Sequence, residues 1–108
     1  METISHYGTQ QAIEDGDLVQ PIEAERRFLV TNEVYASLEA IAGKRGVAVS
    51  TVAWPLLMDA AMIVRRGVQR DPDEYLWTKG LEGNATGERV WIARNEVGGI
   101  TLMFPREY

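Results

Sequence analysis

The 108-residue chain contains no cysteine and only one histidine, His6. Without cysteine neither a disulfide nor a thiolate metal site can form, and a reducing compartment is permitted. A catalytic triad or a histidine-rich metal centre would depend on His6 alone, and no nucleophile-elbow, zinc-protease, phosphate-loop or dinucleotide-binding motif occurs. We therefore predict that the protein is not an enzyme and has no catalytic residue, cofactor or metal ion.

The chain also lacks a long hydrophobic run. Its longest apolar stretch, Val52 to Val64, is interrupted by Pro55 and Asp59 and is shorter than the roughly 20 residues that a membrane helix needs. The first residues are polar and acidic, the opposite of the basic start and apolar run of a signal peptide. We expect a cytoplasmic protein without a membrane contact.

Lysine and arginine are absent from the first 25 residues, which hold six acidic side chains: Glu2, Glu14, Asp15, Asp17, Glu23 and Glu25. The remaining 83 residues hold ten acids and eleven bases, so nearly all of the net charge of −5 lies at one end. This asymmetry favours a basic protein partner, and it disfavours direct binding of nucleic acid, whose phosphates attract lysine and arginine. Glu14, Asp15 and Asp17 are the first candidates for partner binding, followed by Glu23 and Glu25.

Capping residues and apolar spacing predict three helices, over residues 10–15, 32–42 and 50–66. Thr31 or Asn32 should cap the second helix, and Gly16, Gly43 and Gly67 should stand at the three C-terminal ends. Pro55 is expected in, or just inside, the first turn of the last helix. Apolar residues leave only a narrow polar stripe on that helix, so we expect it at the centre of the core.

Five short segments should be extended: 17–20, 26–31, 75–79, 90–94 and 100–104, of which the last three are rich in β-branched and aromatic residues. Asn95–Gly99 fits a β-hairpin with a five-residue loop, or a shorter loop with a bulge. We predict a single α+β domain over residues 1–108, with an acidic N-terminal segment over residues 1–25. It should contain a small antiparallel sheet of three to five strands, two main helices packed on one face and a short N-terminal helix.

A second candidate surface follows from alternation along the predicted strands. If Ile92 faces the core together with Leu102, then Trp91 and Met103 point to the other face of the sheet. Either the N-terminal segment covers that face or the face is an apolar partner surface. Trp77, Trp91 and Met103 are therefore the second set of candidate partner-binding residues, and they would also serve a homodimer.

Five segments together carry a likeness to other proteins: Tyr7, Gln11–Gly16, Leu18–Val19, Trp54–Arg66 and Ile100–Glu107. The chain resembles a family of small uncharacterised bacterial proteins, a domain of unknown function found on plasmids and phages. The central stretch, Pro21 to Gly46, shows little of the likeness. The resemblance implies no catalytic residue, and it implies a mobile-element setting in which small acidic proteins bind and block host defence complexes.

Two functions remain open from the sequence. The first is a non-catalytic phage or plasmid protein that inhibits a host nucleic-acid-handling defence complex, of anti-CRISPR or anti-restriction type. Its partner would be a host protein or ribonucleoprotein, whose basic groove its acidic surface would occupy. The alternative is a homo-oligomeric accessory protein of plasmid or phage replication or transfer, associating through Trp77, Trp91 and Met103.

Overall fold

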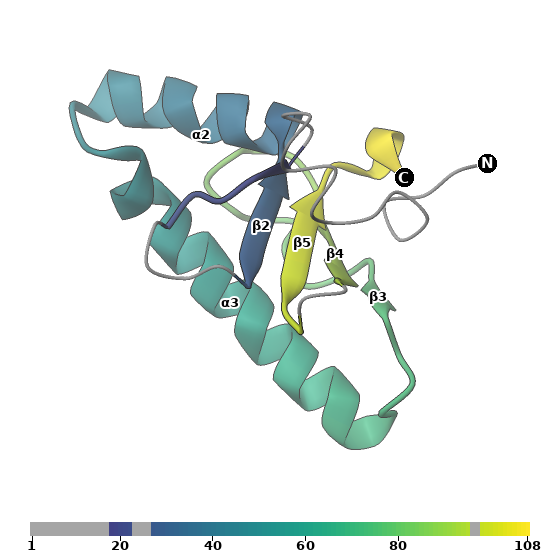
Figure 1. The fold of residues 1–108 in the computed structure, drawn as a ribbon. Helices are drawn as coiled ribbons and strands as arrows, with labels where there is room; N and C mark the ends of the chain where they lie inside the picture. The colour runs from purple at the N-terminus through teal and green to yellow at the C-terminus, as the bar shows by residue number, and fades with distance from the viewer. Residues whose placement is uncertain (1–17, 23–26, 96–97) are drawn as a thin grey trace.

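A computed structural model describes residues 18–22, 27–95 and 98–108 (Figure 1). The described strands are β1 (Leu18–Val19), β2 (Phe28–Thr31), β3 (Leu76–Trp77), β4 (Trp91–Arg94) and β5 (Ile100–Met103). The helices are α2 (Asn32–Arg45) and α3 (Val49–Arg70), and a 3₁₀ turn covers Pro105–Glu107. The predicted α+β class is confirmed, whereas the predicted helix over residues 10–15 lies outside the described residues.

The five strands form one mixed sheet in the order β1-β2-β5-β4-β3. Three of its four strand pairings are antiparallel as expected, namely β1–β2, β3–β4 and β4–β5. The fourth pairing, between β2 and β5, is parallel, with Phe28 opposite Ile100 and Val30 opposite Leu102. The prediction of a purely antiparallel sheet is therefore wrong, since alternation within a strand does not indicate the direction of its neighbour.

Helix α2 begins where the sequence predicts and ends later. Thr31 is the N-cap, and its Oγ1 accepts a hydrogen bond of 3.4 Å from the backbone N–H of Val34. The helix continues through Gly43, the predicted end, as far as Arg45. Gly46 ends it instead, because its φ of 67° lies in the left-handed region and its N–H reaches the carbonyls of Ala42 and Gly43.

Helix α3 is longer at both ends than predicted, and it includes both Pro55 and Gly67 in its interior. Gly67 is therefore not a helix end. A Cβ at this position would lie 2.1 Å from Nε1 of Trp77. The glycine is required because the indole of β3 packs directly on the backbone of α3.

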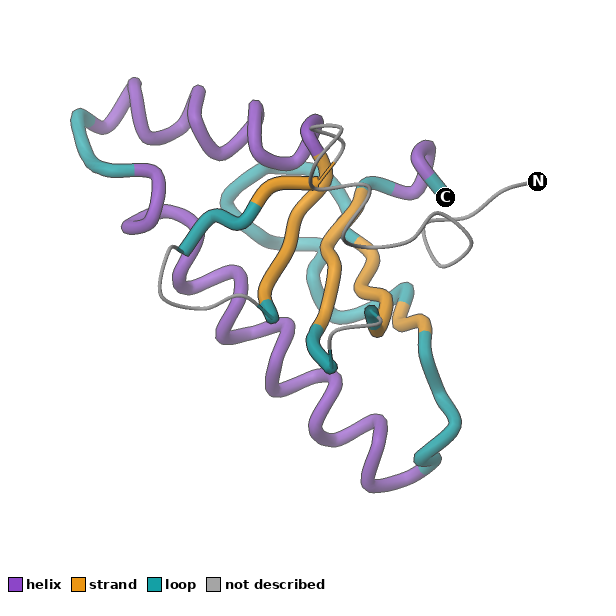
Figure 2. The backbone as a smooth tube through the Cα atoms, viewed as in Figure 1, coloured by secondary structure: helices purple, strands orange, loops and turns teal. Residues whose placement is uncertain are grey.

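The core lies between the two helices and one face of the sheet. Figure 2 shows α2 and α3 as two rods that diverge from a short loop beside the strands. Leu38 of α2, Leu57 of α3, and Ile92 and Leu102 of the sheet are fully buried in one cluster. Neither of the two described helices is long and apolar enough to cross a membrane.

Candidate partner-binding surfaces

The five acidic candidates, Glu14, Asp15, Asp17, Glu23 and Glu25, lie outside the described residues. Their role in partner binding stays a prediction from charge. The other predicted candidates and two further surfaces belong to the described part of the chain.

Trp77, Trp91 and Met103 do not form one surface. In the sheet Trp77 lies opposite Ile92, which faces the helices, whereas Trp91 lies opposite Met103 on the other face. Trp77 is 5% exposed and Met103 is 1% exposed, so neither is presented to solvent. The expected apolar surface around these three residues is therefore absent, because β3 places Trp77 in the row that packs against α3.

Trp91 is half-buried and lies beside the C-terminal residue, Tyr108. Its ring meets the ring of Tyr108 edge to face, at 5.6 Å between centroids and an interplanar angle of 61°. The Tyr108 hydroxyl shares a hydrogen bond with Tyr75, and this contact raises the pKa of Tyr108. The indole Nε1 of Trp91 is buried without a hydrogen-bond partner in the described part of the chain.

The outward side of α3 carries an apolar stripe formed by Trp54, Met58 and Met62, which we call the α3 stripe. Residues four apart lie on the same side of a helix. Trp54 is 46% exposed and Met62 is 53% exposed, and Met58 between them is half-buried. Apolar side chains therefore occupy part of the solvent side of α3 as well, which leaves little of the helix surface to polar residues. The spacing of four was the signal for it in the sequence.

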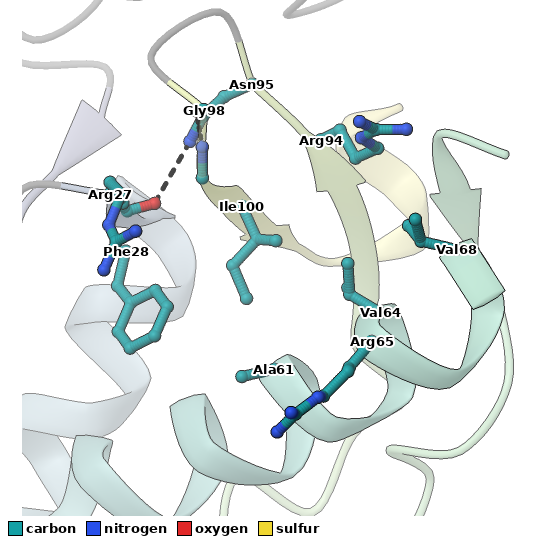
Figure 3. A pocket seen from close by; sticks show the side chains of 11 residues that line it. Arg27, Phe28, Ala61, Val64, Arg65, Val68, Arg94, Asn95, Gly98 and Ile100 are labelled. Atoms are coloured by element: carbon teal, nitrogen blue, oxygen red, sulfur yellow. Dashed lines mark hydrogen bonds between the residues drawn. The ribbon is translucent and has the colours of Figure 1, made fainter. Parts of the chain in front are cut away.

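A cleft of about 340 Å³ opens between α3 and the adjoining ends of β2, β4 and β5 (Figure 3). Its apolar lining consists of Phe28, Ala61, Val64, Val68 and Ile100. Arg27, Arg65 and Arg94 also line it, and we call it the arginine cleft. These arginines come from three distant parts of the chain, so no local sequence pattern predicts that they lie together.

Hydrogen bonds to backbone carbonyls fix the walls of the arginine cleft. The carbonyl of Arg27 accepts from the N–H of Ile100 at 2.8 Å and from Nδ2 of Asn95 at 3.3 Å, the bond drawn in Figure 3. Across the cleft, NH1 of Arg94 donates to the carbonyls of Pro72 and Glu74. The described residues that line the cleft include no aspartate or glutamate, so its lining carries a local excess of positive charge.

The C-terminal turn is attached to the start of α2 through Glu107. Its Oε2 accepts hydrogen bonds from Oγ1 of Thr31 at 2.7 Å and from the N–H of Phe104 at 2.8 Å. Partial burial raises the pKa of Glu107 and so does the nearby Glu33 carboxyl, against the opposing effect of the two hydrogen bonds. Arg106 pairs with Glu33 at 3.5 Å. These contacts stabilise the turn, and we assign them no binding role.

In the part of the chain that the structure describes, no three His, Asp or Glu side chains gather in a way that could hold a metal ion. Comparison with known proteins finds no matching family model, no matching curated protein and no matching solved structure. The resemblance to small plasmid and phage proteins therefore stays a prediction.

Proposed function

We propose that this chain is a non-catalytic binding protein of a phage or plasmid that inhibits a host nucleic-acid-handling defence complex. The exposed α3 stripe is the observation that carries the binding role. Its two ends, Trp54 and Met62, are about half exposed, whereas the side chains on the core-facing side of the same helix are buried. Tryptophan and methionine are enriched at protein interfaces relative to the rest of the surface.

The acidic segment indicates the class of partner. The first 25 residues hold six carboxylates and no base, so they complement a basic groove. A groove that binds DNA or RNA phosphates is such a site, and carboxylates compete for it by occupying the same positive field. In this proposal the acidic segment directs the chain to the groove, and the α3 stripe packs against an apolar patch beside it.

A second copy of this chain is the competing occupant of the α3 stripe. Self-association through Trp77, Trp91 and Met103 is disfavoured, because Trp77 and Met103 are buried. A homo-oligomeric accessory protein of replication or transfer would therefore have to use the α3 stripe. Sedimentation velocity at two protein concentrations separates the cases, since the inhibitor is expected to remain monomeric.

The test is affinity capture from a host-cell lysate with three versions of the chain. The double variant Trp54→Gln/Met62→Gln alters the α3 stripe, and Val47→Gln is the control, since Val47 is also an exposed apolar residue but lies in the loop before α3. The wild type and the control should capture the same protein, and the stripe variant should bind it about thirtyfold more weakly or not at all.

The captured protein is then assayed for DNA or RNA binding in the presence of the chain. Competition with nucleic acid that weakens at high salt supports the proposal. Equal capture by the stripe variant, or a partner whose nucleic-acid binding is unchanged, would contradict it.

A further inference from the structure

The arginine cleft is lined by apolar side chains and by arginines. Aliphatic and aromatic side chains line its floor, including Val64 and Val68 of α3 and Ile100 of β5. Guanidinium groups stand around them, with Arg27 and Arg65 on opposite walls (Figure 3). A ligand that matches both parts has an apolar body and an anionic group at one end.

The cationic part of the cleft suits a carboxylate or a phosphate. A guanidinium presents its donors as a planar fork that matches the oxygens of either group. Arg65 is exposed, and within the described residues its side chain makes no hydrogen bond or ion pair. Its charge is therefore not neutralised by a described neighbour, whereas NH1 of Arg94 is engaged by two backbone carbonyls.

The size of the cleft favours a small molecule over a segment of a protein partner. Its volume of about 340 Å³ is at the lower end of the roughly 300 to 1,000 Å³ found for small-molecule sites. Its walls are also preformed, because hydrogen bonds join Arg27 to Ile100 and Asn95. A preformed site loses less entropy when a ligand binds.

We propose that the arginine cleft binds a small organic anion, a carboxylate or phosphate group on an apolar body, with Arg65 as a principal contact to the charge. Phe28, Val64 and Val68 contact the apolar body. This site is separate from the α3 stripe and the acidic segment, so it stands or fails independently of the proposed inhibitor function.

The test measures binding of simple probes to the full chain by isothermal titration calorimetry. Octanoate and octyl phosphate carry the two anionic groups on the same apolar chain. Octanol lacks the charge, and acetate lacks the apolar body. We expect at least one of the two octyl anions to bind about tenfold more tightly than octanol and acetate, with an affinity that falls as salt rises. The tighter of the two identifies the anionic group.

Two matched variants locate the site. Arg65→Gln removes the charge of an exposed arginine that lines the cleft, and Arg66→Gln removes the charge of the next arginine of α3, which does not line it. Both are exposed, so both should fold, which thermal unfolding verifies. Arg65→Gln should weaken binding of the octyl anion about tenfold, and Arg66→Gln should leave it unchanged.

Three results would overturn the proposal. The first is equal binding by the two arginine variants, and the second is equal binding of octanol and the octyl anions. The third is binding of a short glutamate-rich peptide without binding of either octyl anion, because the cleft would then be a docking groove for a protein.

Discussion

Helix α3 can pack against Trp77 of the sheet because residue 67 is a glycine and has no Cβ. A Cβ at Gly67 would approach Nε1 of Trp77 to 2.1 Å, far inside van der Waals contact. Gly67→Ala should therefore lower the free energy of unfolding by about 1 to 3 kcal/mol, although alanine favours a helix interior by about 1 kcal/mol. Urea unfolding measures the change.

Gly43 is the matched control for this substitution. It also lies inside a helix, but an added Cβ would have no atom within 4 Å. Gly43→Ala should raise the free energy of unfolding by about 0.5 to 1 kcal/mol. If both substitutions stabilise the protein, then Trp77 does not pack on α3 as described.

Glu107 makes stability depend on pH in an unusual direction for a carboxyl group. Its pKa in the folded protein lies above the ordinary value of 4.5, chiefly because the group is partly buried. The folded state then holds the proton more tightly than the unfolded state, so its contribution is fully present below the unfolded pKa and is lost as pH rises through the folded pKa. Glu107→Gln keeps an oxygen that accepts from Thr31 and Phe104, and should remove this loss.

Urea unfolding at several pH values between about 4 and 7 tests this prediction. As pH rises, the free energy of unfolding of Glu107→Gln should increase relative to that of the wild type. Glu39→Gln, at an exposed position of α2, serves as the control. A difference between wild type and Glu107→Gln that stays constant with pH, or that shifts toward the wild type, would contradict the assignment.

Local rules predicted some residues of this fold and misplaced others. The sequence predicts a helix cap at Thr31 or Asn32, and the structure has it at Thr31. The same local rules predict helix ends at Gly43 and Gly67, because a glycine after a helical pattern commonly has that role, and both glycines lie inside helices instead. The reason for Gly67 lies in Trp77, which touches it only through the tertiary fold.

At the scale of elements, α3 has two apolar sides with different roles. Leu56 faces the core and is 4% exposed, whereas Met62 in the α3 stripe is 53% exposed. Leu56→Ala should lower the free energy of unfolding by about 2 to 5 kcal/mol, and Met62→Ala should change it by less than about 0.5 kcal/mol. Denaturant unfolding of the two variants tests the orientation of the helix, and a similar cost for both would contradict it.

The elements were easier to predict than their arrangement. The predicted extended segments contain all five strands, and the turn residues Asn95–Gly99 predict the β4–β5 hairpin. The parallel pairing of β2 with β5 could not be predicted, because it joins Phe28 to Ile100 across two helices and two strands. Nothing in the local pattern of either strand specifies a partner so distant along the chain.

At the scale of the whole molecule, the candidate sites differ in how visible they are in the sequence. The acidic segment is visible because its six acids lie within the first 25 residues, which contain no lysine or arginine. The α3 stripe can be recognised in the sequence only from the spacing of four between its residues, once the core-facing apolar residues of the helix have been set apart. The arginine cleft was not predictable, since Arg27, Arg65 and Arg94 meet only after the sheet has formed against α3.

The central claim is that the acidic segment directs this chain to a basic partner. Reversing Glu14 and Asp15 to lysine should leave thermal stability almost unchanged and slow association, because complementary charge acts mainly by steering the encounter with a partner. The matched control reverses Glu39 and Asp73, two exposed acids elsewhere on the domain, and changes the net charge by the same amount. It should associate almost as fast as the wild type.

The measurement that tests this claim most directly is the association rate with the captured partner at low and high salt. We predict that the wild type associates faster than the roughly 10⁵ to 10⁶ M⁻¹s⁻¹ of uncharged docking, and that salt slows it by screening. The Glu14→Lys/Asp15→Lys variant should associate more slowly and depend less on salt. Association that is independent of salt and equal for the wild type and this variant would contradict the account.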